Sequence, residues 1–128
     1  MIKIVWIVLV ACFSLTTQGQ NYETYHFWFK RKKISVPIKK EQNILVNDIC
    51  ALNLKTCLAL EASKKKIKEI DFKKIAQGNI AGAYCEKLEG SLLVLSNVKG
   101  EDTEFCHFED KSMIDAYALY QKVSKGKK

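Results

Sequence analysis

Two short stretches after residue 20 alternate between apolar and other residues. In residues 25–29, YHFWF, large rings recur at every second position, and in residues 34–38, ISVPI, branched aliphatic residues do the same. A period of two is typical of β-strands. With the basic residues 30–33 as a turn, the pattern predicts a β-hairpin whose alternate rings face a core. Pro37 places the second strand at a sheet edge or near its own end, because proline cannot donate a ladder hydrogen bond.

The stretch 44–62, ILVNDICALNLKTCLALEA, contains two cysteines. In one continuous helix, Cys50 and Cys57 would lie about 10.5 Å apart along the axis, whereas a disulfide needs Cα atoms within roughly 7 Å. A bond between them would therefore exclude a single helix. We predict a hairpin that turns at Asn53-Leu54. The charged residues 63–78 that follow fit a short helix or an extended connector.

From Asn79 onward the apolar residues have helical spacing. Asn79 is a suitable N-cap and Gly90 a suitable terminator, and the apolar positions between them fall on one helical face: Ile80, Ala81, Tyr84, Cys85 and Leu88. Residues 91–96, SLLVLS, and 103–108, TEFCHF, predict two strands joined by a loop that contains Gly100.

Ser112 and Asp115 have the spacing of a capping box, which predicts a final helix over MIDAYALYQKV. Its expected inward side chains are Met113, Ile114, Tyr117, Tyr120 and Val123. Together these elements predict an α+β fold, a small disulfide-stabilised domain in which a helix–strand–strand–helix unit follows one or more N-terminal β-hairpins. The expected divisions are a basic N-terminal region at 20–78, the cysteine-containing unit at 79–122 and a basic, disordered tail at 123–128.

The first 19 residues have the layout of a secretory signal peptide. Lys3 precedes an apolar run over residues 4–15, which is shorter than the roughly 20 residues that span a bilayer, and small or polar residues follow. Cleavage after Gly19 would release a soluble chain into the periplasm or the exterior. Alternatively, residues 9–12, LVAC, resemble a bacterial lipobox, in which a lipidated Cys12 would anchor the protein to a membrane.

Four cysteines remain after Cys12, namely Cys50, Cys57, Cys85 and Cys106. An even number of cysteines in a small exported chain indicates two disulfides rather than redox or metal chemistry. Four cysteines allow three pairings, and their spacing alone leaves the choice open.

The net charge of +7 is unevenly distributed along the chain. Residues 20–84 contain 13 Lys or Arg and 6 Asp or Glu, whereas residues 85–120 contain 3 and 8. Such asymmetry favours contact with an anionic surface or partner, and a solvated, lysine-rich surface that keeps the chain soluble is the alternative. The candidate contact residues are Lys30, Arg31, Lys32, Lys33, Lys39, Lys40, Lys64, Lys65 and Lys66.

The stretch 104–112, EFCHFEDKS, contains a thiol, an imidazole and three carboxylates. Cys106 and His107 are neighbours on a predicted strand, so their side chains point to opposite faces and the imidazole cannot easily activate the thiol. The cysteine spacings do not match a zinc site, and the acidic pairs 101–102 and 109–110 do not match a calcium loop. We therefore expect no catalytic residue, cofactor or metal, and export argues against a nucleic-acid partner.

Three short motifs occur in order within residues 79–120: Tyr-Cys-Glu in the first helix, Gly-x-Leu leading into the first strand and Cys-x-Phe at the end of the second. With this spacing the stretch resembles a small bacterial domain of unknown function that occurs in exported proteins and lipoproteins, often under a haemolysin label. The resemblance implies export and a compact α+β module, but no activity. The matching positions are Asn79, Ala81, Tyr84, Cys85, Glu86, Gly90, Leu92, Cys106, Phe108, Asp110, Ser112, Ala118, Leu119 and Tyr120.

The sequence departs from that family's pattern at several positions. Ile80 stands in place of a proline, and Ile114 stands in place of the first of two late cysteines, both of which are missing. Because those two are missing, the resemblance implies that the retained cysteines pair as Cys85–Cys106, which leaves Cys50–Cys57 as the second bond.

These observations predict a non-enzymatic, exported bacterial module that binds an anionic envelope component or a partner protein, with an anionic membrane surface as one candidate. The basic residues would supply the electrostatic contact, and the disulfide-bonded unit would supply the scaffold. A secreted membrane-active, haemolysin-like or inhibitory effector is the alternative.

Overall fold

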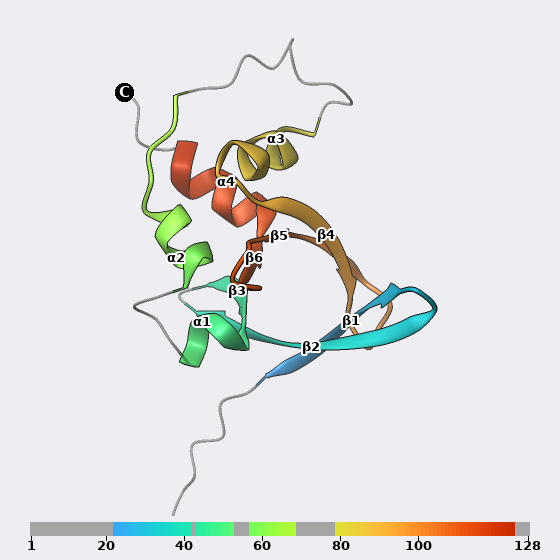
Figure 1. Cartoon of the computed structure of the whole chain (residues 1–128). Coiled ribbons are helices and arrows are strands. Elements are labelled where there is room, and N and C mark those ends of the chain that lie inside the picture. Colours follow the sequence, from blue (N-terminus) through green and yellow to red (C-terminus); the bar gives the residue numbers. More distant parts are fainter. Residues whose placement is uncertain (1–21, 42, 53–56, 69–78, 125–128) are drawn as a thin grey trace, which may run out of the picture.

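The computed structural model describes residues 22–41, 43–52, 57–68 and 79–124 (Figure 1). Its elements in chain order are β1 (Glu23–Phe29), β2 (Lys32–Glu41), β3 (Ile44–Asn47), α1 (Asp48–Leu52), α2 (Leu58–Ser63), α3 (Ile80–Lys87), β4 (Ser91–Ser96), β5 (Asp102–His107), β6 (Met113–Asp115) and α4 (Ala116–Ser124). The strands close an antiparallel barrel in the order β1-β2-β3-β6-β5-β4. The short helices gather along one side of that barrel (Figure 1).

The predicted α+β fold class is wrong, because strands from both halves of the chain share one closed sheet. β1 pairs with β4 through His26 and Ser96, and β3 pairs with β6 through Val46 and Ile114. The N-terminal strands therefore do not precede a separate helix–strand–strand–helix unit, since they complete its sheet into a barrel. Alternation along a strand predicts a local hairpin, but it carries no information about which strand lies on the other side.

The N-terminal hairpin itself is confirmed. β1 pairs with β2 along its whole length, with Lys30 and Arg31 at the turn. Pro37 lies inside β2, which is not an edge strand because the barrel is closed. Pairing between β2 and β3 begins only at Ile38. Pro37 therefore has a neighbouring strand on one side only, which makes its missing N–H tolerable.

The hairpin predicted within residues 44–62 is wrong. β3 leads directly into α1, and α2 begins after residues 53–56, which lie outside the described residues together with the expected turn at Asn53-Leu54. Cys50 and Cys57 are joined by a disulfide, with Cα atoms 5.1 Å apart. Two separate short helices satisfy the restriction that excluded one continuous helix. Of the predicted connector, residues 65–68 have no regular secondary structure, and residues 69–78 are outside the described chain.

The last helix begins later than predicted. Residues 113–115 form β6 and pair with β5, so the expected capping box between Ser112 and Asp115 is wrong. Asp115 is itself the cap, because its Oδ1 accepts hydrogen bonds from the backbone N–H groups of Tyr117 at 2.9 Å and Ala118 at 3.1 Å. The strong pairing of a three-residue strand overrides the helical pattern at this point.

The inward face of α4 was predicted only in part. Val123 is fully buried as predicted and Tyr120 is partly buried against the helical core. Tyr117, which was expected to face inward, is 59% exposed, and Leu119 is fully buried instead. Met113 and Ile114 are buried as predicted, but they are strand residues. α4 continues through Ser124, so it includes the first two residues of the expected tail.

Alternating strand residues build two apolar cores. One core fills the barrel with Tyr25, Val36, Ile38, Leu95, Phe105 and Met113. The other core lies between the barrel wall and the helices, and it includes both disulfides and Tyr84, Leu88, Phe108, Leu119 and Val123. Neighbours on β5 face different cores, since Phe105 belongs to the barrel and Cys106 to the helical layer. The sheet is therefore buried on both faces where the helices cover it.

The predicted N-cap of α3 is confirmed, because Oδ1 of Asn79 accepts a hydrogen bond from the N–H of Gly82 at 2.9 Å. The other end of the helix differs from the prediction. α3 ends at Lys87, and the residue with a left-handed conformation is Glu89, with φ 69°, rather than Gly90.

Gly90 is required for a different reason. A Cβ at this position would overlap Sγ of Cys106 and would lie 3.0 Å from Sγ of Cys85. The Cys85–Cys106 disulfide, whose Cα atoms are 5.6 Å apart, therefore packs against bare backbone, which only glycine provides.

We predict that Gly90→Ala lowers the free energy of unfolding by about 1–3 kcal/mol, the cost of overpacking a tight core. In a Cys85→Ala/Cys106→Ala background the cost should fall below about 1 kcal/mol, because the overlapping sulfur atoms are gone. Urea denaturation of the wild type, the cysteine double variant and the Gly90→Ala form of each measures the cost of the substitution in both backgrounds. An equal cost in the two backgrounds would show that the sulfurs do not impose the glycine.

Candidate anion-binding surface

The stretch 104–112 forms a structural corner between β5 and β6. Cys106 is fully buried and bonded to Cys85, while the neighbouring His107 is half-buried. The thiol is therefore not available to the imidazole as a nucleophile. The structure joins the same two cysteine pairs that the family resemblance implies.

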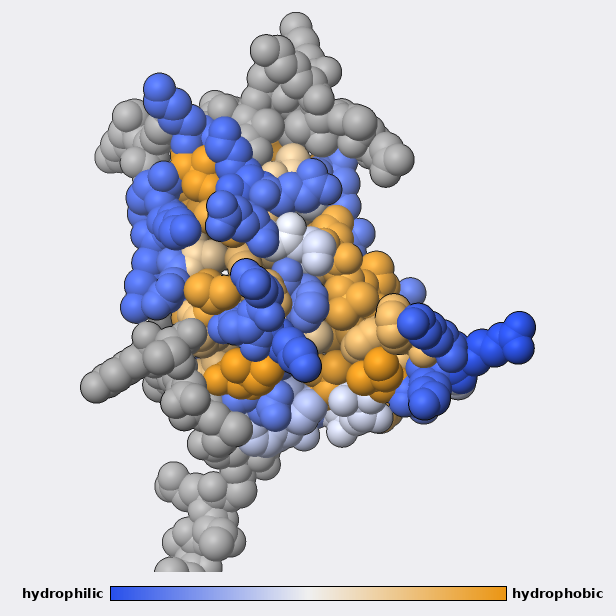
Figure 2. All heavy atoms as spheres, viewed as in Figure 1, coloured by the Kyte–Doolittle hydropathy of each residue, from blue (hydrophilic) through white to orange (hydrophobic). Residues whose placement is uncertain are grey.

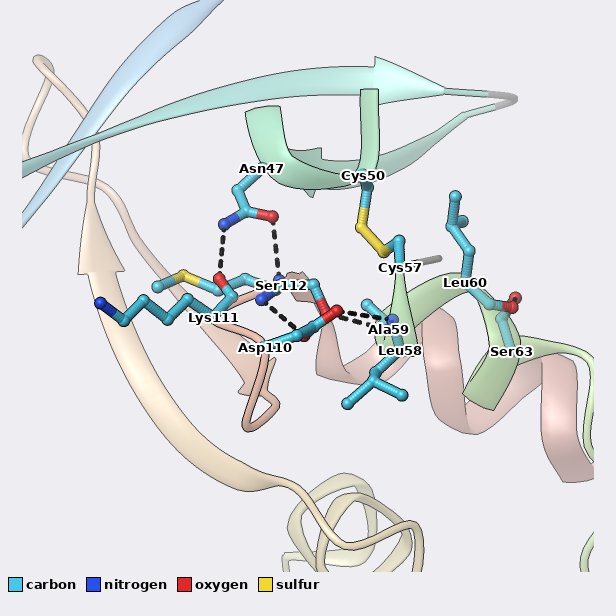
Figure 3. Close-up of a disulfide and its surroundings, with 11 residues drawn as sticks. Asn47, Cys50, Cys57, Leu58, Ala59, Leu60, Ser63, Asp110, Lys111 and Ser112 are labelled. Atoms are coloured by element: carbon cyan, nitrogen blue, oxygen red, sulfur yellow. Dashed lines mark hydrogen bonds between the residues drawn. A yellow bond between two sulfur atoms is a disulfide. The ribbon is translucent and has the colours of Figure 1, made fainter. Parts of the chain in front are cut away.

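Asp110 and Ser112 tie this corner to the start of α2 (Figure 3). Oδ2 of Asp110 accepts a hydrogen bond from the N–H of Leu58 at 2.9 Å, and Oγ of Ser112 accepts one from the N–H of Ala59 at 3.0 Å. The first N–H groups of a helix have no partner within the helix. Two side chains from more than fifty residues further along the chain therefore cap α2.

The hydrogen bonds also set the pKa of the Asp110 carboxyl. Burial would raise this pKa, but hydrogen bonds from Leu58 and Ser112 stabilise the carboxylate and outweigh burial, so the pKa lies below its ordinary value of 3.8. Oδ1 accepts from both the N–H and the hydroxyl of Ser112, at 2.9 and 2.5 Å. Asp110 is thus a structural carboxylate, not a proton donor near neutral pH.

Asn47 holds the corner from the opposite side (Figure 3). Its Nδ2 donates to the carbonyl oxygen of Lys111 at 2.8 Å, and its Oδ1 accepts from the N–H of Met113 at 3.0 Å. The side chain is only 2% exposed. Both halves of the amide are therefore used, and the residues in 104–112 that resembled an active site form a corner.

The basic residues 30–33 lie at the tip of the β1–β2 hairpin, which projects from the barrel (Figures 1 and 2). All four side chains are exposed. Lys30 and Arg31 form the turn with φ of 48° and 65°, the positive values that a tight hairpin turn needs and that usually select Asn or Gly. Nζ of Lys30 lies 5.4 Å from the centre of the Phe29 ring.

A second basic site is an open groove beside α3. It is lined by Lys65, Lys66, Ile67, Lys68, Lys87, Leu88 and Glu89. The segment 65–68 is held against the end of α4, because Ile67 N–H donates to the Val123 carbonyl at 3.1 Å and Lys66 Nζ donates to the Lys122 carbonyl at 3.0 Å. This groove brings four lysines and one glutamate together.

The structure does not gather the predicted basic residues into one patch. Lys39 and Lys40 lie six or more residues from the hairpin tip along β2, which is about 20 Å in a strand, and Lys39 is paired with Glu41 at 2.6 Å. The segment 64–66 follows α2, on the side of the molecule away from the hairpin tip (Figure 1). The surface therefore has separate cationic sites.

Two of the four groove lysines were not singled out from the sequence. Lys68 lies in the charged connector and Lys87 in the last turn of α3, where lysine is ordinarily a solvated residue. No local pattern links them, because the groove forms only when the connector packs against α4.

Within the parts of the chain that the structure describes, no group of three or more His, Cys, Asp or Glu side chains is arranged to hold a metal ion. Among the same residues, no helix has the length and apolar character needed to cross a membrane. The candidate lipidation site, Cys12, lies outside the described residues.

Comparison with known protein families gives one match, and it covers the C-terminal part of the chain. Residues 76–123 match a domain of unknown function, DUF333. The DUF333 region contains α3, β4, β5, β6 and most of α4, so it supplies half of the barrel strands. No curated protein and no solved structure matches the chain.

We predict that Asp110→Asn lowers the free energy of unfolding near neutral pH by about 1–3 kcal/mol, because one amide oxygen cannot accept from all the donors. The folded carboxyl has the lower pKa, so its stabilisation is complete above the unfolded value of 3.8 and is lost as pH falls through the folded pKa. The stability difference between wild type and variant should therefore shrink below pH 3.8.

Denaturant titrations of both proteins at a series of pH values measure this difference. The exposed neighbour Glu109 provides the matched control, since Glu109→Gln should change stability by less than about 0.5 kcal/mol. A stability gap for Asp110→Asn that is the same at neutral and acidic pH would contradict the assignment.

Proposed function

We propose that this protein is an exported, non-enzymatic bacterial binding module that attaches to an anionic component of the cell envelope. The observation that carries this proposal is the hairpin tip, where residues 30–33 are four consecutive exposed cations. Among the described residues, none of the four has a carboxylate partner, whereas Lys39 pairs with Glu41. Cations that balance no acid of the fold attract an anionic surface.

The backbone of the tip supports a role other than folding. Left-handed φ values cost roughly 1–2 kcal/mol for an L-residue with a side chain, and both Lys30 and Arg31 adopt them. Such strain tends to persist where a residue is needed for function. Two cations at this turn place their charge at the most distant point of the hairpin.

Export is part of the proposal. A signal peptide at residues 1–19 would deliver the chain to the periplasm or the exterior, and lipidation of Cys12 is the alternative. The two disulfides support an oxidising compartment. Because all four of these cysteines are bonded, they supply no thiolate for catalysis.

A membrane-active effector, with the haemolysin label of the resembled family, is the second candidate. The observation in its favour is that Trp28 and Phe29, directly before the basic turn, are 67% and 55% exposed. An acidic partner protein is a further ligand that the same cations would fit.

We predict that the chain starting at residue 20 co-sediments with a bacterial envelope fraction and that binding weakens as salt rises. Lys30→Asn/Arg31→Gly should weaken binding by about 2 kcal/mol, or roughly thirtyfold, because each cation near an anionic surface contributes about 1 kcal/mol. The same variant should be at least as stable as wild type, since Asn-Gly is the preferred pair for this turn.

The matched control is Lys39→Gln/Lys40→Gln, which removes the same charge at the far end of β2. It should retain most of the binding. Binding that does not depend on salt, or that both variants weaken equally, would contradict attachment through the hairpin tip. Because the tip variant is expected to fold better, loss of its binding cannot be attributed to unfolding.

A further inference from the structure

An apolar stripe leaves the barrel along the β1–β2 hairpin. Tyr25 and Val36 are opposite each other and buried in the barrel core. Two residues further along each strand, Phe27 and Ile34 are also paired and share that face, and beyond them Phe29 is 55% exposed. Phe27 still packs against the barrel core, but beyond it Ile34, at 37% exposed, and Phe29 continue the same face where no described residue buries them.

The ribbon is exposed because the pairing between β1 and β4 is short. β1 pairs with β4 only through His26 and Ser96, so residues 27–34 form a two-stranded extension beyond that point. On the opposite face of this extension, Trp28 is 67% exposed and lies across from Lys33. Both faces of the ribbon thus carry exposed rings, and its end carries four cations.

Figure 2 shows the hydrophilic tip projecting beside an apolar part of the surface. A contiguous exposed apolar patch with a polar rim marks an interaction site, whereas single scattered apolar residues on a surface are ordinary. A flat or shallow protein surface would cover one face of the ribbon and leave the other in water. A lipid surface surrounds both faces, and tryptophan is enriched at the level of the headgroups.

We propose that the β1–β2 hairpin is a membrane-surface anchor, in which residues 30–33 contact anionic phospholipid headgroups while Trp28, Phe29 and Ile34 enter the interfacial layer. The inference rests on the proposed function and names its ligand as an anionic bilayer. The cations and the apolar side chains would both be needed, since a single membrane-binding contribution gives only marginal, reversible attachment. Insertion is shallow, because the outer edges of the ribbon have backbone groups that need water or headgroups.

The chain offers a direct reporter for this contact. Trp28 is the only tryptophan in residues 20–128, so the tryptophan emission of that chain, excited selectively over tyrosine, arises from the proposed anchor. With vesicles of phosphatidylcholine mixed with anionic phosphatidylglycerol, we expect the Trp28 emission to shift to the blue and acrylamide quenching to fall. Vesicles of phosphatidylcholine alone should produce neither change.

Two variants separate the contribution of the cations to vesicle binding from the contribution of the inserted apolar side chains. Phe29→Ser should weaken partitioning to the anionic vesicles about tenfold, by loss of a partly buried ring, and Lys30→Asn/Arg31→Gly roughly thirtyfold. Val98→Ser is the matched control, because Val98 is 78% exposed in the β4–β5 turn and its loss should leave partitioning unchanged.

The outcomes distinguish this inference from the proposed function. Salt-sensitive binding to envelope fractions with an unchanged Trp28 spectrum on anionic vesicles overturns the anchor, and the ligand is then an acidic protein or polysaccharide. Equal spectral shifts on neutral and anionic vesicles overturn the role of the cations. Full partitioning of Phe29→Ser overturns insertion. Loss of envelope binding at every salt concentration overturns the proposed function itself.

Discussion

The side-chain amide of Asn47 makes the contact on which closure of the barrel depends. It donates to the carbonyl of Lys111 and accepts from the N–H of Met113, so it fixes the chain where β5 turns into β6. β3 and β6 pair directly only at Val46 and Ile114, and the adjacent amide supplies the hydrogen bonds that this short ladder lacks. A buried amide that loses either partner costs the desolvation of that group. Asn47 therefore reinforces one of the two junctions, β3–β6 and β1–β4, at which a single residue pair closes the barrel.

The DUF333 region shares both of its cores with residues outside it. Its strands β4, β5 and β6 leave a sheet open at two edges, and β1 to β3 close it. Its barrel-facing Leu95 and Phe105 pack against Tyr25, Val36 and Ile38. On the helical side, the side chains of Asp110 and Ser112 accept hydrogen bonds from the first N–H groups of α2. A chain limited to residues 76–123 would expose these apolar residues and leave those polar groups to water.

Local features were predictable from the sequence, and long-range ones were not. The Asn79 cap, the β1–β2 hairpin and the two strands after Gly90 each depend on neighbouring residues, and each has a recognisable pattern. Barrel closure depends on single pairings such as His26 with Ser96, which no period reveals. The candidate site follows the same division: residues 30–33 were recognised as basic and turn-forming, but Phe29 was expected in a core. A period of two indicates the face of a strand, not how far the strand extends past its neighbour.

The hairpin tip shows a conflict between folding and another requirement. Folding favours Asn-Gly at a turn where both residues have positive φ, and it favours ending the ribbon where β4 stops pairing with β1. The chain instead has Lys-Arg at the turn, and the ribbon continues past that point with the rings of Trp28 and Phe29 exposed. Neither choice lowers the free energy of the isolated fold, and both act in the same small region. A ligand that neutralises the cations and covers the rings would remove both costs at once, and the proposed bilayer with anionic headgroups would do so on both faces of the ribbon.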